Sequence, residues 1–164
     1  MARDPRKWNR RDALIFSPLF ILPILFIVLD CSGLLFPVVG KQASLVNGIT
    51  HDLGITVPAS LHVEHAARLA TRDPAYFYAC SIDPADIPAF VALLKAASYY
   101  DESASQSDKR FSMEKTPAWY DPGSAPDVST IKFDIPAKGD LSASGYWFFL
   151  SPSAHKVWVY WFST

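Results

Sequence analysis

The sequence has little of the features that usually identify a reaction. Only two cysteines, Cys31 and Cys80, occur among its 164 residues, which excludes a disulfide framework. Its seven glycines are scattered, so neither a glycine-rich phosphate loop nor a G-x-S-x-G nucleophile turn is present. Charge is nearly balanced, with 15 Lys and Arg against 16 Asp and Glu. This balance gives no electrostatic reason to bind nucleic acid.

What the sequence does have is a long apolar run. The 17 residues from Ala13 to Leu29, ALIFSPLFILPILFIVL, contain no charge. At about 1.5 Å per residue a helix of this length spans roughly 26 Å, slightly less than the hydrocarbon core of a bilayer. The run therefore predicts a transmembrane signal anchor over 13–36, with Asp30 near one membrane interface. A carboxylate is tolerated there far better than at the bilayer centre.

The residues before this run predict its orientation. Its N-terminal flank is basic, whereas the first basic residue after the run is Lys41. The positive-inside rule then places a cytoplasmic tail at 1–12 and everything after the membrane segment outside the cytoplasm. The expected location is a cell membrane crossed once, with the N-terminus cytoplasmic. The basic residues of the flank are Arg3, Arg6, Lys7, Arg10 and Arg11.

Two other readings of the N-terminal region remain open. In a cleavable signal peptide, Val38 and Gly40 would occupy the −3 and −1 positions, although the apolar stretch is long for such a signal. In a lipoprotein, Cys31 would carry the lipid, but the acidic Asp30 stands where a small residue is expected. A disulfide between Cys31 and a second copy of the chain is untested, and Cys80 is interpreted as a small buried hydrophobe.

The remaining sequence predicts a juxtamembrane segment over 37–60, with a weak helix at 41–55, and an extracytoplasmic α+β domain over 61–164. Two strand-like runs between 62 and 82 flank the turn pair Asp73-Pro74. A helix follows, and Asp83 and Asp86 are interpreted as residues of its first turn. The expected fold is thus an N-terminal transmembrane helix followed by a small antiparallel ββαβββ sheet packed on one helix. The later elements are a helix at 84–98 and strands at 128–135, 145–150 and 156–162.

Aromatic residues are denser near the C-terminus than a minimal core requires. One alternating set of them must face away from the single expected helix. Large rings with a polar tip are favoured at interfaces, so this face is a candidate surface for a protein partner or a small ligand. The alternative is that the 99–127 segment folds over it as a second small core. The candidate surface residues are Trp119, Tyr120, Trp147, Phe149, Trp158 and Tyr160.

No catalytic or metal site is predicted. His62, Glu64 and His65 lie within four residues, but on a strand they cannot converge without a bulge, and their spacing is not that of H-E-x-x-H metalloproteases. No catalytic residue, cofactor or metal is therefore assigned, and enzymatic activity is left uncertain and disfavoured. The predicted function is a membrane-anchored, non-catalytic domain that binds a partner or ligand. The alternatives are an accessory subunit that contacts a membrane complex through its membrane helix at Asp30, and an envelope hydrolase or metal-dependent enzyme.

Overall fold

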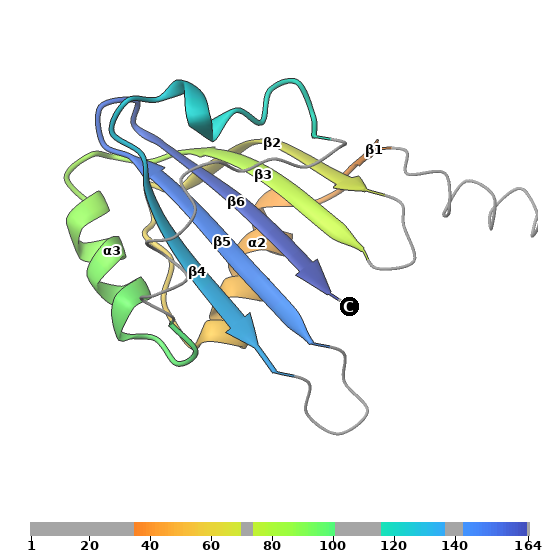
Figure 1. Ribbon diagram of the computed structural model, residues 1–164, viewed down its shortest axis with the longest axis horizontal. Helices are drawn as coiled ribbons and strands as arrows, with labels where there is room; N and C mark the ends of the chain where they lie inside the picture. Colours follow the sequence, from red (N-terminus) through yellow and green to blue (C-terminus); the bar gives the residue numbers. More distant parts are fainter. Residues whose placement is uncertain (1–34, 70–73, 101–115, 137–142, 164) are drawn as a thin grey trace, which may run out of the picture.

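The computed structural model describes residues 35–69, 74–100, 116–136 and 143–163. Within them lie six strands and two α-helices, with a short 3-10 helix η1 (Pro122–Ser124). The strands form one antiparallel sheet in the order β1-β2-β3-β6-β5-β4 (Figure 1). The other elements are β1 (Leu35–Pro37), α2 (Lys41–Leu53), β2 (His62–Leu69), β3 (Ala75–Ser81), α3 (Ile87–Ala96), β4 (Ser129–Ile135), β5 (Ser144–Ser151) and β6 (Lys156–Ser163).

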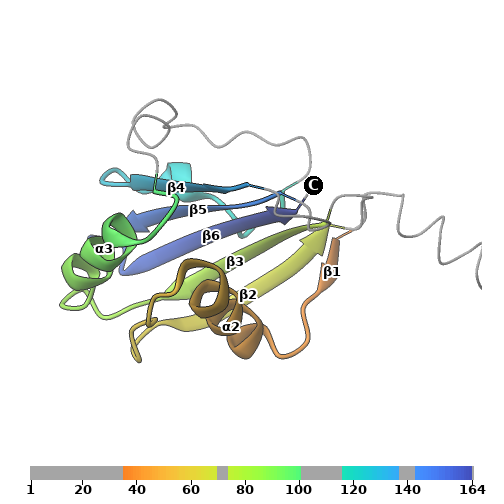
Figure 2. The ribbon, with the colours of Figure 1, turned by 90° about the horizontal axis from the view of Figure 1, so that it is seen from below.

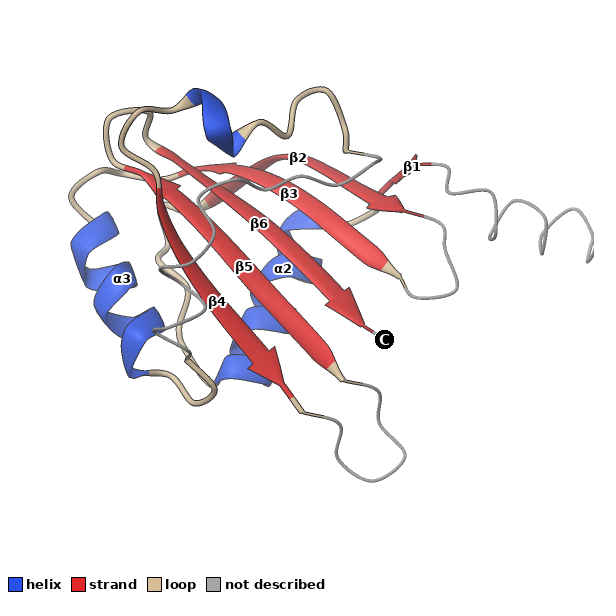
Figure 3. Ribbon diagram, viewed as in Figure 1, coloured by secondary structure: helices blue, strands red, loops and turns tan. Residues whose placement is uncertain are grey.

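The expected fold class is wrong in two respects. The sheet has six strands rather than five, and two helices rather than one lie on it (Figure 3). At a spacing of about 4.8 Å, six strands are about 24 Å across. A helix with its side chains is only about 10 Å wide, so one helix cannot cover this face. The second helix is α2, which the sequence predicted only weakly and placed beside the membrane.

The predicted helix over 13–36 is also corrected at its end, because its last two residues belong to β1. Leu35 and Phe36 pair with Leu69 and Arg68 of β2. A short apolar run does not distinguish a strand from a helix by its pattern, and Pro37 is compatible with an edge strand. Residues 13–34 lie outside the described residues. Among those described, no helix has the length and apolar character needed to cross a bilayer.

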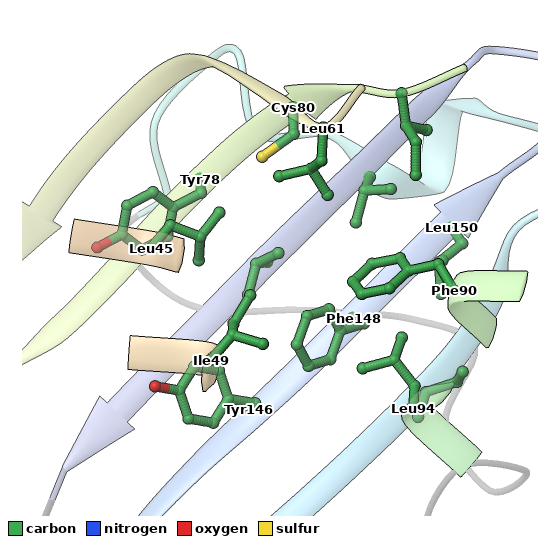
Figure 4. Close-up of a cluster of buried hydrophobic side chains, with 14 of the residues drawn as sticks. Leu45, Ile49, Leu61, Tyr78, Cys80, Phe90, Leu94, Tyr146, Phe148 and Leu150 are labelled. Atoms are coloured by element: carbon green, nitrogen blue, oxygen red, sulfur yellow. The ribbon is translucent and has the colours of Figure 1, made fainter. Parts of the chain in front are cut away.

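One face of the sheet is covered by both helices, as seen in Figure 2. Leu45, Ile49 and Leu53 of α2 recur every four residues and are buried, which places one stripe of the helix against the sheet. Gly54 ends α2 in the left-handed conformation, at a φ of 69°. The buried stripe of α3 consists of Ile87, Phe90 and Leu94. In Figure 4, Leu45 and Ile49 of α2 lie beside Tyr78 and Tyr146, and Phe90 and Leu94 of α3 lie at the other end of the same cluster, beside Phe148 and Leu150.

The opposite face is covered by the segment 116–128, which precedes β4. This segment carries η1 and lies on the other side of the sheet from the helices (Figure 2). Its Tyr120 is only 4% exposed and packs with Phe77 of β3 and Phe149 of β5. Strands β5 and β6 are therefore buried on both faces, which explains why their sequences are apolar throughout rather than alternating.

The N-terminal turn of α2 completes the outer edge of β2. Strand β1 pairs only with residues 67–69 of β2, so the first half of β2 needs other partners on that side. Gln42 Nε2 donates to the carbonyl of Leu61 at 2.8 Å, and Gln42 Oε1 accepts from the amide of Val63 at 2.7 Å. Lys41 Nζ donates to the carbonyl of Glu64. One amide side chain thus makes the two bonds that a neighbouring strand would make.

We expect Gln42→Ala to lower the free energy of unfolding by about 1–3 kcal/mol, since it leaves two part-buried backbone groups unpaired. The amide of Val63 should also exchange its hydrogen faster than in the wild type. The control is Asn47→Ala, at an exposed position of the same helix. Chemical unfolding of the full chain with hydrogen exchange measures both effects. Equal stability of the two variants would show that Gln42 does not hold the edge of β2.

Candidate functional site

The six aromatic residues predicted as a partner surface lie on or over the face opposite the helices. Tyr120, Phe149, Trp158 and Tyr160 are between 2% and 7% exposed, whereas Trp119 and Trp147 are half-buried. The fold brings them together, with ring centroids 6.5 Å apart for Tyr120 and Phe149 and 5.8 Å apart for Trp147 and Tyr160. Most of this surface is therefore interior. A partner at the remaining edges of Trp119 and Trp147 stays a prediction.

The histidine region of β2 does not gather metal ligands. A register shift at Glu64 supplies the bulge that convergence of His62 and His65 would need. However, Glu64 pairs with Lys156, and this hydrogen bond holds the pKa of the carboxyl below its ordinary value. His65 instead stacks on Trp119, with ring centroids 5.4 Å apart. No cluster of three potential metal ligands occurs in the part of the chain that the structure describes.

Two other acidic residues belong to the start of α3. Asp83 Oδ1 accepts the amide of Ala85 at 2.9 Å, and Asp86 Oδ2 accepts the hydroxyl of Ser60 at 2.5 Å. Residues 84–86 form a turn, so the helix begins at Ile87, three residues later than predicted. Each of these two carboxylates thus accepts a hydrogen bond within the protein. Their positions give no reason to treat them as an acid–base pair.

Of the two cysteines and the candidate membrane-helix residue Asp30, only Cys80 lies among the described residues. Cys80 is fully buried, and burial raises its pKa to about 12. Its thiol therefore stays protonated at neutral pH, which is the state of an inert core residue. Cys31 and Asp30 lie outside the described residues, so a contact of Asp30 within a membrane complex stays a prediction.

A cavity of about 200 Å³ lies between α2 and the sheet. The helix contributes one wall, formed by Ser44, Leu45, Gly48 and Asp52. The sheet contributes the other, formed by Tyr76 and Tyr78 of β3, Tyr146 of β5 and Trp161 of β6. In Figure 4 the hydroxyls of Tyr78 and Tyr146 lie beside α2, at the end of the core away from Phe90 and Leu94 of α3.

The glycine in the middle of α2 is explained by a close approach at this cavity. A β-carbon at Gly48 would lie 2.9 Å from the hydroxyl of Tyr146, closer than such a contact permits. A helical glycine costs about 0.5–1 kcal/mol relative to alanine, so its presence needs such a reason. The space left by Gly48 lets Tyr146 Oη pass the helix and donate to Asp52 Oδ2 at 2.7 Å.

The tyrosine hydroxyls keep their protons in this site. Burial raises the pKa of Tyr146 far above its ordinary value, and the bond to the Asp52 carboxylate raises it further. Burial likewise raises the pKa of Tyr78, whose hydroxyl lies 3.2 Å from Ser44 Oγ. Protonated phenols can donate hydrogen bonds. The Tyr146 proton is therefore directed to Asp52 and orients that carboxylate at the cavity.

The aromatic rings of the sheet wall form one continuous group. Ring centroids are 4.8 Å apart for Tyr76 and Trp161 and 6.2 Å apart for Tyr146 and Trp161. Tyr76 and Tyr78 stack nearly parallel at 6.4 Å. The indole nitrogen of Trp161 is buried and has no hydrogen-bond partner among the described residues. The site thus combines a broad apolar wall with a small number of fixed polar groups, which is the usual composition of a ligand pocket.

Sequence reasoning did not find this site. Its lining comes from four separated elements, and tyrosines at alternate positions of a strand are usual in any half-buried sheet. The one local signal is Gly48, a glycine next to the stripe of Leu45, Ile49 and Leu53 in the middle of a predicted helix. No local motif marks Asp52, because its partner Tyr146 is 94 residues away in the sequence.

Comparison of the chain with protein-family models, curated proteins and solved structures found no match.

Proposed function

We propose that this protein is held at a membrane by its apolar N-terminal run and that its folded part, outside the cytoplasm, binds a small ligand without catalysing a reaction. The observation that carries the proposal is the cavity between α2 and the sheet. The uncharged run from Ala13 to Leu29 and its basic flank support the location. The ligand site is placed at the cavity rather than at the predicted aromatic surface, because most of that surface is buried.

The size of the cavity limits the ligand. In another protein an apolar cavity of about 150 Å³ binds benzene, so about 200 Å³ suits a compact molecule of similar or slightly larger size. The lining offers shape and a few hydrogen-bonding groups. The described residues of the lining do not place a nucleophile beside a base, which is the arrangement that covalent catalysis requires.

The test is to close the cavity from its exposed side. Ser44 lines the cavity but lies on the exposed part of α2, so we expect Ser44→Trp to fill the opening with little effect on folding. Ala43→Trp is the matched control, since this neighbouring residue is also exposed but does not line the cavity. The measurement is NMR screening of small fragments against the full chain in non-ionic detergent.

We expect at least one fragment to bind the wild type saturably. Its binding should be lost in Ser44→Trp and kept in Ala43→Trp. The proposal would be overturned if no fragment bound, or if every fragment bound equally to both variants, since binding would then occur elsewhere. Thermal unfolding of the two variants verifies that both are folded.

A further inference from the structure

The charge of the cavity sets the class of its ligand. Asp52 is the one charged side chain among the described residues that line it, and 25% of this side chain is exposed. An anionic ligand would meet a carboxylate at short range. A purely apolar ligand would remove water from that carboxylate without replacing the lost hydrogen bonds, which is unfavourable. A cation is attracted to the carboxylate, and this attraction offsets the loss of water from it.

The Asp52 carboxylate can also accept more interactions than it makes within the protein. Its Oδ2 accepts from Tyr146 at 2.7 Å, and its Oδ1 lies 2.8 Å from His51 Nδ1. An ionised carboxylate offers about four acceptor positions, so these two contacts leave others for a ligand. Tyr146 fixes the orientation of the group in advance, which reduces the entropy lost on binding.

The aromatic wall favours the same class. The rings of Tyr76 and Tyr146 each contact the ring of Trp161. A cation within about 6 Å of an aromatic centroid is attracted to the ring quadrupole, and more strongly where water is excluded. Aromatic rings beside a carboxylate are suited to an ammonium group that carries alkyl substituents, because the substituents also bury apolar area.

The geometry points to a small alkylammonium compound as the ligand of this cavity, held by the Asp52 carboxylate and by the rings of Tyr76, Tyr146 and Trp161. This inference rests on the proposed function, since it names the chemical class that the same site takes. The site discriminates by charge, so it binds the cation more tightly than a neutral molecule of the same shape.

Choline and its uncharged isostere 3,3-dimethylbutan-1-ol test this discrimination directly. Both are titrated into the full chain in non-ionic detergent, with the indole resonance of Trp161 followed by NMR. We expect choline to bind at least about 10-fold more tightly than the isostere, in line with one hydrogen bond or contact to a charged group. This comparison uses the wild type and does not depend on the folding of any variant.

Asp52→Asn should weaken choline binding by about 10- to 100-fold and leave the isostere unchanged. The asparagine keeps the shape and an acceptor for Tyr146. Asp86→Asn is the matched control, because Asp86 is also part-buried and accepts one hydroxyl hydrogen bond, but it lies at the start of α3. It should leave the binding of both compounds unchanged.

The outcomes separate this inference from the proposed function. Equal binding of the two compounds, or tighter binding of the isostere, would overturn the alkylammonium class and leave a ligand cavity. If neither compound bound, but a fragment bound the wild type and not Ser44→Trp, the alkylammonium class would again be overturned and a ligand cavity would remain. No binding of any compound or fragment would overturn both.

Discussion

Replacing Phe148 by alanine is expected to lower the free energy of unfolding by about 3–5 kcal/mol. Phe148 is on β5, is fully buried, and packs edge-on against Phe90 of α3 and Phe133 of β4. Alanine would leave a cavity where α3 meets the sheet. Because a domain of this size is usually stable by about 5–15 kcal/mol, the loss is a large fraction of the total.

The control for this prediction is Leu93→Ala on α3, the helix against which Phe148 packs. Leu93 is 43% exposed, so its truncation should cost less than about 1 kcal/mol. The measurement is chemical unfolding of the full chain, followed by near-ultraviolet circular dichroism. Similar losses for the two variants would contradict the packing of α3 on β5.

Tyr120→Ala is expected to have a comparable effect, about 3–5 kcal/mol, on the opposite face of the sheet. The ring centroid of Tyr120 lies 5.1 Å from that of Phe77 and 6.5 Å from that of Phe149. Without this ring the segment 116–128 loses its contacts with Phe77 and Phe149 of the sheet. Trp158, now 7% exposed, should then become accessible to solvent.

Acrylamide quenching of tryptophan fluorescence measures this second effect. Quenching should increase in Tyr120→Ala and stay at the wild-type level in Asp121→Ala, since Asp121 is an exposed neighbour in the same segment. An unchanged stability and quenching in Tyr120→Ala would mean that 116–128 does not cover this face. The aromatic surface predicted from sequence would then be open to a partner.

Much of the sheet could be predicted from the sequence because its signals are local. The turn pair Asp73-Pro74 separates two runs rich in strand-forming residues, and β2 and β3 lie where these runs are. The three C-terminal strands differ from their predicted bounds by one residue at most. The helix predicted at 84–98 is present as α3, although the turn at 84–86 delays its start to Ile87.

Strand β1 and helix α2 depend instead on contacts between residues that are distant in the sequence. Strand β1 is three residues long and is defined by its pairing with β2 rather than by its own sequence. The helix α2 is mostly polar and contains a glycine at position 48, so its place in the core depends on Leu45, Ile49 and Leu53 meeting the sheet. Such tertiary contacts often decide elements whose intrinsic preference is weak.

The cavity lay beyond sequence reasoning for the same reason. Asp52 and Tyr146 meet only because Gly48 leaves room between a helix and a strand that are far apart in the chain. Composition indicated correctly that aromatic residues exceed the needs of a minimal core. Of the two alternatives for the outward-facing set, a partner surface and a second small core, the structure shows the core, which lies under 116–128. The sequence did not indicate that the other set forms the wall of a cavity under α2.

The most direct test of a ligand site at α2 is to detect a bound molecule against its walls. We would measure intermolecular nuclear Overhauser effects between choline, or the best fragment from the screen, and the aromatic protons of the full chain. We expect contacts with the rings of Tyr76, Tyr146 and Trp161, which line the cavity. Contacts confined to other rings, such as Trp119 or Trp147 on the opposite face, would contradict it.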